Sequence, residues 1–142
     1  MNELVNRLTE LSGQQATDLL DTLALSDIDF PQYSQDLTTL AELPLTHEQQ
    51  TELARETLIV LAEQNPTQAE AINAMLNHPP PQRFDGGMSI ATIVGVVVLL
   101  RTHVKIKRNT QGKWELLIEH KPANNSLLGS LIEKIQALLK QQ

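Results

Sequence analysis

The chain lacks cysteine and has few aromatic residues, and both shortages restrict what it can be. Because none of its 142 residues is cysteine, disulfides, thiolate metal sites and thiol nucleophiles are excluded. Aromatic residues make up 3% of the chain, so a hydrophobic core has to be built from leucine, isoleucine, valine and alanine. The hydrophobic content of 41%, with 20% charged residues, is typical of a globular domain.

Motifs that carry chemistry are also missing. No serine lies in a Gly-x-Ser-x-Gly elbow, and Asp85-Gly86-Gly87 lacks the lysine and the spacing of a phosphate-binding loop. Asp27 and Asp29 lack the glycine and the distal glutamate of a calcium loop. The histidines form no metal-binding cluster: His47, His78, His103 and His120. We therefore expect a non-enzymatic protein without catalytic residues, metal or cofactor.

No apolar run is long enough to cross a membrane. The most apolar stretch, residues 88–100, has about 13 residues, whereas a spanning helix needs roughly 20. Arg101, His103 and Lys105 follow it directly and prevent its extension on that side. The N-terminus shows no basic segment followed by an apolar stretch, the pattern of a secretory signal. We expect a cytoplasmic protein. The alternative is a membrane-surface protein that uses residues 88–100, which the lack of spanning length and of a second anchor disfavours.

What the chain does have is an uneven distribution of charge around a net charge of −6. Residues 1–78 carry thirteen acidic and two basic side chains, whereas residues 79–142 carry four acidic and nine basic ones. Such asymmetry indicates two modules with different surfaces. Two interpretations stay open: the halves attract each other within one folded unit, or one half faces a partner of opposite charge.

Residues 1–78 are predicted to form an acidic bundle of about five short helices. Apolar residues at helical spacing mark a first helix that stops at Ser12-Gly13. Residues 26–31 are predicted as a turn and residues 34–43 as a helix closed by Pro44, while another helix runs to about Gln64. Three capping boxes predict helix starts: Ser12 with Gln15, Thr46 with Gln49, and Thr67 with Glu70. Residues 79–87, which begin with three prolines, are predicted to be a linker.

Residues 88–142 are predicted to form a basic helix–hairpin–helix (αββα) module, which makes the chain an α+β protein. Residues 88–100 favour a helix because Gly86-Gly87 and Ser89 suit its start, although the four valines leave a strand as the alternative. This segment is apolar on all sides and has to be buried on several. A last helix begins at Ser126 with an apolar stripe at i, i+3, i+4 and i+7 spacing, which we expect to pack on the apolar face of the hairpin.

The hairpin is the most closely specified element. Polar and apolar residues alternate over residues 103–107, and Asn109 and Gly112 suit a type I turn with glycine in the left-handed region. Pairing Asn109 with Lys113 sets the register, in which a slip of one residue would bring Ile106 against Glu115. Because both edges of a lone hairpin are unpaired, we consider pairing with a strand of another chain. The predicted pairs are Val104–Ile118, Ile106–Leu116, Arg108–Trp114, Lys107–Glu115 and His103–Glu119.

Two groups of residues are predicted to face a partner. The helix around Val94, Val97 and Val98 is too apolar for a module of about 60 residues to cover, which predicts a partner surface or a homo-oligomer. The second group consists of four basic residues and the chain's one tryptophan: Arg101, Lys105, Lys107, Arg108 and Trp114. As an alternative, this group could bind nucleic acid, with the indole as a stacking platform. The nearby glutamates and the negative net charge favour a protein partner instead.

Several features of the second half occur together: the glycine pair at 86–87, a helix of small apolar residues, its Leu100-Arg101 exit, a first strand with Val104-Lys105-Ile106, Gly112 in the turn, Leu116 in the second strand and a leucine-rich closing helix. With them, about 55 residues resemble the effector-associated constant components, which accompany proteases and ATPases in bacterial conflict systems. Gln111-Gly112 stands where Asp-Gly is usual in that family, and the N-terminal half does not carry its usual start.

The resemblance implies a function and a kind of partner. Members of that family are thought to be non-catalytic partners, encoded beside effectors and small helical adaptor domains. The resemblance therefore implies a non-catalytic adaptor or regulatory protein that binds an effector, such as a protease or ATPase, through protein–protein contacts. It supplies no catalytic residues.

Overall fold

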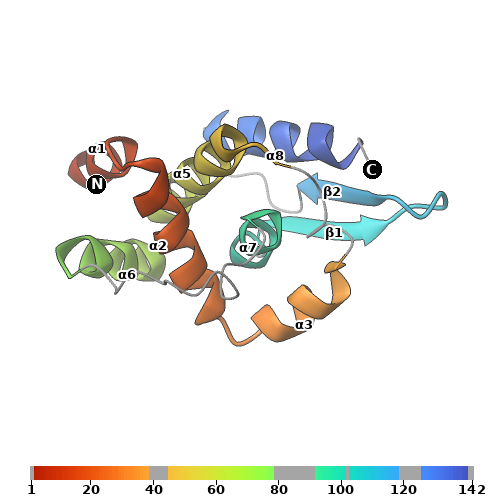
Figure 1. Ribbon diagram of the computed structural model, residues 1–142, viewed down its shortest axis with the longest axis horizontal. Helices are drawn as coiled ribbons and strands as arrows, with labels where there is room; N and C mark the ends of the chain where they lie inside the picture. Colours follow the sequence, from red (N-terminus) through yellow and green to blue (C-terminus); the bar gives the residue numbers. More distant parts are fainter. Residues whose placement is uncertain (1, 39–44, 79–91, 102, 119–125, 141–142) are drawn as a thin grey trace.

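The computed structural model describes residues 2–38, 45–78, 92–101, 103–118 and 126–140. Within these residues there are seven helices and one two-stranded antiparallel sheet, which lies at one end of the fold, an α+β combination dominated by helix (Figure 1). None of the described helices is long and apolar enough to cross a membrane. The elements are α1 (Asn2–Thr9), α2 (Gly13–Leu25), α3 (Phe30–Asp36), α5 (His47–Gln64), α6 (Pro66–Asn77), α7 (Thr92–Leu99), β1 (Val104–Arg108), β2 (Trp114–Ile118) and α8 (Ser126–Leu139).

Two of the predicted capping boxes are confirmed. At the start of α2, Ser12 Oγ accepts a hydrogen bond from the Gln15 backbone N–H at 3.2 Å, and Gln15 Oε1 accepts one from the Ser12 N–H at 3.1 Å. Thr46 and Gln49 make the same reciprocal pair before α5, at 3.1 and 2.9 Å. Each box satisfies two N–H groups at a helix start, which lack a partner within the helix.

The third capping box is wrong, because α6 begins earlier than predicted. Its N-cap is Asn65, whose Oδ1 accepts hydrogen bonds from the N–H groups of Thr67 and Gln68 at 3.0 and 3.2 Å. Pro66 occupies the first turn, where its missing N–H costs nothing and its fixed φ suits a helix. Thr67 therefore lies inside the helix, and Glu70 has no capping role.

The predicted boundaries of α3 are also wrong. Helix α3 begins at Phe30 and ends at Asp36, whereas the sequence predicts a turn up to Pro31 and a helix over 34–43. The first turn of a helix accommodates proline, so Pro31 lies in the first turn of α3 and does not delay its start. The turn before α3 is closed by the Asp27 carboxylate, which accepts a hydrogen bond from the Asp29 N–H at 2.9 Å. Residues 39–44 lie outside the described residues.

Helix α7 lies in the middle of the fold, and its helical conformation confirms the preferred prediction for residues 92–99 over the strand alternative. Every residue from 92 to 100 is buried, and α7 packs against α2, α5 and α3 (Figure 1). Valine has a low intrinsic helix propensity, so this helix is held by its surroundings. Residues 79–91, which include the predicted linker, lie outside the described residues.

The acidic and basic parts of the chain share one hydrophobic core. Buried residues from α1 to α6 and from α7 to α8 belong to a single cluster. Ion pairs also join the two parts: the Lys134 ammonium on α8 binds the carboxylates of Glu52 and Glu56 on α5, the second at 2.8 Å. The structure thus supports the interpretation in which the oppositely charged halves attract each other within one folded unit.

The hairpin has the predicted register in every pair within the described residues. Val104 lies opposite Ile118, and the pairing continues to Arg108 opposite Trp114. Gly112 has φ +78°, the left-handed conformation that glycine adopts without strain, and its N–H donates to the carbonyl of Asn109 at 3.0 Å. As expected, α8 packs against β2. The predicted pair of His103 with Glu119 lies partly outside the described residues.

Candidate protein-binding surface

The apolar residues predicted to face a partner are part of the core, which corrects that expectation. Val94, Val97 and Val98 are 2%, 2% and 0% exposed. The prediction assumed that residues 88–142 had to cover this helix alone, whereas α2 and α5 from the first half cover it. A partner could reach these valines only by displacing α2 and α5 from α7. Each valine that lost its place in the core would cost about 1.5–3 kcal/mol of burial free energy.

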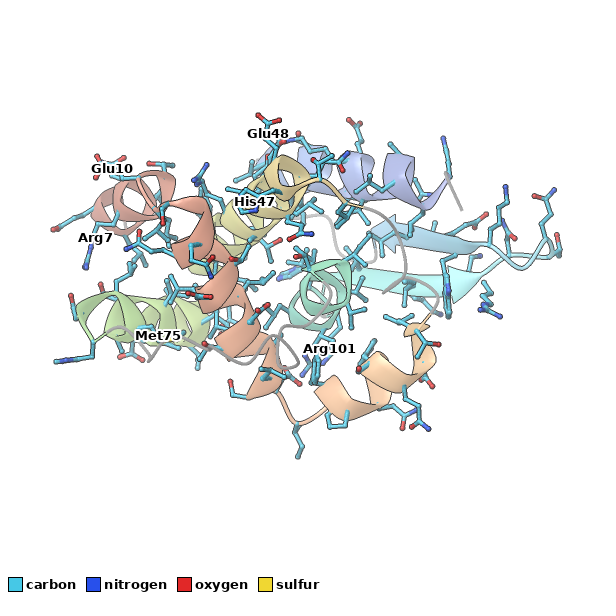
Figure 2. All side chains as sticks on the ribbon, viewed as in Figure 1. Arg7, Glu10, His47, Glu48, Met75 and Arg101 are labelled. Carbon is cyan, nitrogen blue, oxygen red and sulfur yellow. The ribbon has the colours of Figure 1, made fainter. Side chains whose placement is uncertain are left out.

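Arg101 was also predicted to bind a partner, and it holds the chain's own turn instead. Its Nη1 lies 2.7 Å from Asp27 Oδ2, and its Nε lies 3.2 Å from Asp29 Oδ2. Nη1 also donates to the carbonyl of Val98 at 2.7 Å. Figure 2 shows Arg101 between the end of α7 and the turn that connects α2 to α3. Arg101 therefore fixes that turn to the core helix, and its charge is neutralised within the chain.

The predicted basic residues that do face solvent lie on one side of the hairpin. Lys105 and Lys107 are exposed and alternate along β1 with residues on its buried side. Across the sheet, Lys105 pairs with Leu117 and Lys107 pairs with Glu115. We call these four residues the outer face of the hairpin. Glu115 is held at its place, because its Oε1 accepts a hydrogen bond from Asn109 Nδ2 at 2.9 Å. The opposite side carries Val104 and Leu116, which are buried in the core.

Arg108 and Trp114 lie on that opposite side and contact each other. They pair across the strands, and the Arg108 guanidinium carbon lies 4.8 Å from the centre of the Trp114 ring. This is a cation–π contact. Arg108 therefore contacts the face of the Trp114 indole, and the ring lies on the opposite side of the sheet from Lys105 and Lys107.

The two edges of the hairpin differ. The bonded pair of Asn109 with Lys113, whose N···O distance is 2.8 Å, sets the alternation of bonded and non-bonded pairs along the strands. By that alternation the N–H and C=O of Leu116 point outward from β2, and the N–H donates to Gln136 Oε1 of α8 at 2.9 Å. The same alternation points the N–H and C=O of Ile106 outward from β1, and no described strand pairs with that edge.

A small cavity lies beside the outward edge of β1. It has a volume of about 310 Å³. Its lining comes from three elements, so residues far apart in the sequence meet at this edge: Tyr33 of α3, Val97 of α7, Arg101, and Val104, Lys105 and Ile106 at the start of β1.

Two large apolar residues, Ile28 and Leu117, are exposed although neither belongs to the predicted binding residues. Leu117 is 43% exposed on the outer face of the hairpin, and the predicted register already paired it with Lys105. Ile28 is 89% exposed at the tip of the turn that Arg101 holds. An isoleucine between Asp27 and Asp29 in a predicted turn was the available signal, because a turn gives an apolar side chain little to pack against.

A larger cavity of about 720 Å³ lies between α1, α2 and α6, and Arg7, Glu10 and Met75 at its border are labelled in Figure 2. Polar groups of its lining already make hydrogen bonds within the chain: Arg7 donates to Asn73 of α6 at 3.3 Å, and Gln14 donates to Asp18 at 2.9 Å. Within the described residues, no group of three or more histidine, aspartate or glutamate side chains is placed to hold a metal ion.

Comparison with known proteins identifies no relative. No family model matches the sequence, and neither the curated proteins nor the solved structures include a significant match. The outer face and the β1 edge of the hairpin are therefore candidate binding surfaces on the basis of their exposure and charge.

Proposed function

We propose that this chain is a non-catalytic adaptor that binds an effector protein, such as a protease or ATPase, in a bacterial conflict or signalling system. In this proposal an acidic helical bundle (1–78) and an αββα module (88–142) form the body, and the hairpin is the binding element. The resemblance of the second half to effector-associated constant components supports the choice of partner.

The observation that carries the proposal is the outer face of the hairpin. Lys105, Lys107 and Leu117 are exposed there on a strand pair whose other side is anchored in the core. The fourth residue of this face, Glu115, is half-buried, so the exposed part combines an apolar side chain with two positive charges, which suits a protein patch of acidic and apolar residues. Because the register is fixed, the backbone that carries these side chains needs no reordering on binding, which lowers the entropic cost of association.

The arrangement gives less support to nucleic-acid binding. A single-strand binder combines basic side chains with aromatic rings on one surface. In this chain Trp114 lies on the side of the sheet opposite Lys105 and Lys107, and Arg108 already contacts its ring. The lysines therefore lack the stacking platform that the alternative requires.

The proposal is tested by comparing three tagged proteins in affinity capture from cells of the source organism. These are the unmodified chain, the double variant Lys105→Glu/Lys107→Glu, and the control Lys140→Glu, which reverses an exposed charge after the end of α8. We expect an effector to be captured by the unmodified chain and the control but lost with the double variant. Titration with the purified effector should then give the same order of affinities.

Two results would overturn the proposal. One is a captured protein whose affinity is equal for all three chains, because binding would then not involve the hairpin. The other is retention of a single-stranded oligonucleotide by the unmodified chain at ~50 mM salt and its loss with the double variant, since electrostatic binding is strongest at low salt.

A further inference from the structure

We propose that the outward edge of β1 binds an extended segment of the partner by strand addition, and that this segment alternates acidic and apolar residues. The proposal rests on the function proposed above and names the contact through which it acts. In strand addition, main-chain hydrogen bonds provide affinity and alternate side chains provide specificity.

The backbone of β1 offers the required hydrogen-bonding groups. Asn109 and Lys113 form a bonded pair, so the next bonded pairs along the antiparallel ladder are Lys107 with Glu115 and Lys105 with Leu117. The N–H and C=O groups of the residues between them, Ile106 and Arg108, point away from β2. An added strand can bind these groups without breaking any hydrogen bond of the hairpin.

The other edge of the hairpin is less suited to this role. The outward N–H of Leu116 on β2 already donates to Gln136 Oε1, and α8 packs along that strand. A strand that approached β2 would have to displace a side chain of α8, whereas β1 borders the 310 Å³ cavity. The difference between the edges assigns the added strand to β1.

The side chains around this edge determine the chemistry of the segment. On the outer face, Lys105 and Lys107 are exposed, and directly opposite residues of an added strand would lie about 4.5–5.5 Å away between Cβ atoms. Acidic residues are favoured there. On the other side, the position opposite Ile106 lies next to the cavity lined by Tyr33 and Val97, which favours an apolar residue. Successive residues of a strand alternate between the two sides, which yields the alternating pattern.

A second copy of this chain fits the edge less well. Pairing β1 with β1 of another copy would bring two sets of Lys105, Lys107 and Arg108 together. Like charges directly opposite each other destabilise a strand pair, and natural edge strands use lysine to prevent such pairing. Charge complementarity therefore favours a different, acidic chain.

The first test uses the full chain and a fluorescein-labelled peptide of alternating glutamate and valine. We expect binding tighter than about 1 mM, with amide hydrogen exchange at Ile106 and Arg108 slowed at least about tenfold at saturation, since both N–H groups acquire partners. The exchange rate at Lys107, which already bonds within the hairpin, should change little. Absence of binding, or binding without protection of Ile106 and Arg108, overturns strand addition.

A matched pair of variants tests the backbone contact separately. Arg108→Pro removes an outward N–H without removing a hairpin bond, while Arg108→Ala removes the same side chain and keeps the N–H. We expect the proline variant to bind the peptide at least about tenfold more weakly than the alanine variant. Equal affinities overturn the proposal. If the proline variant does not fold, the exchange measurement on the unmodified chain decides.

The same variants distinguish strand addition at β1 from the adaptor function proposed above. An effector that is lost with Lys105→Glu/Lys107→Glu but binds Arg108→Pro and Arg108→Ala equally leaves the adaptor function standing and overturns strand addition. An effector that binds all variants equally overturns both. A concentration-dependent dimer in light scattering that is lost with Arg108→Pro but kept with Arg108→Ala identifies a second copy as the occupant and overturns an acidic partner.

Discussion

Arg101 and Asp27 are 74 positions apart in the sequence, yet Arg101 Nη1 lies 2.7 Å from Asp27 Oδ2. The ion pair joins the residue that follows the central helix to the turn between α2 and α3. It is one of the points where the basic and acidic parts of the chain meet, and its contribution to stability is measurable.

We expect Arg101→Met to lower the free energy of unfolding by about 1.5–3 kcal/mol, because it leaves the mostly buried Asp27 carboxylate without its charged hydrogen-bond donor. Urea unfolding of Arg101→Met, Asp27→Asn and the double variant measures the effect and the coupling of the two side chains. Lys113→Met, at an exposed position of the hairpin turn, is the control. If the two single effects add without coupling, the pair does not stabilise the fold.

Two aspartate substitutions separate the core from the proposed binding surface. Val97→Asp places a carboxylate at a position that is 2% exposed, and we expect loss of the folded state because burying an unpaired charge costs several kcal/mol. Leu117→Asp changes a residue that is 43% exposed, and it should leave the unfolding midpoint nearly unchanged while weakening partner binding. Circular dichroism during thermal unfolding distinguishes the two. A folded Val97→Asp would contradict the placement of α7 in the core.

A pair of glycine substitutions tests the packing of α2 on α5. A Cβ at Gly13 would lie 2.5 Å from Thr51 Oγ1, closer than atoms can approach, whereas a Cβ at Gly129 meets nothing within 4 Å. We expect Gly13→Ala to destabilise by about 1–3 kcal/mol. Gly129→Ala, within helix α8, should stabilise by about 0.5–1 kcal/mol. Denaturant unfolding gives both values, and equal signs for the two substitutions would be inconsistent with the structure.

Lys134 makes stability depend on pH in the alkaline range. Burial disfavours its charged form, but hydrogen bonds to Glu52 and Glu56 outweigh that effect and raise the pKa of Lys134 above its ordinary value of 10.5. A raised pKa stabilises the folded state below the unfolded-state pKa, and this contribution is lost as the pH rises through the folded-state pKa. The effect is limited to about 1 kcal/mol or less because the Lys134 side chain is 38% exposed.

The variant Lys134→Met measures this contribution by urea unfolding. It should be less stable than the unmodified chain at pH 8, and the difference should shrink at a pH above the raised pKa. Lys140→Met provides the matched control on an exposed lysine after the same helix. A difference that persists unchanged at high pH would mean that Lys134 acts through its aliphatic chain.

The hairpin could be predicted from the sequence in full detail because its information is local. The alternation from Val104 onward determines which side of each strand is apolar, and Asn109 and Gly112 determine the turn, so the register follows. The two capping boxes at Ser12 and Thr46 are local in the same way. The third failed because Asn65 and Pro66 together are a stronger helix start than Thr67 with Glu70.

The surroundings of α7 could not be predicted, because they depend on segments far away in the sequence. Its composition showed that it had to be buried but not what would bury it, and Val97 was therefore assigned to a partner. The same limit applies to Arg101, whose two carboxylate partners lie more than 70 residues earlier. Lys105 and Lys107 were predicted as exposed basic residues from the alternation alone, and Leu117 follows from the same register.

The central position of α7 also has a consequence during synthesis. Ribosomes add about 5–20 residues per second, so α2 and α5 are made seconds before the helix that they enclose. During that interval α2 and α5 can pack on each other, and α5 can pack on α1 and α6, but the apolar side chains that contact α7 in the finished fold lack that partner. A chain that ends before residue 92 would lack the helix that covers these side chains, and we expect such a fragment to expose them to solvent.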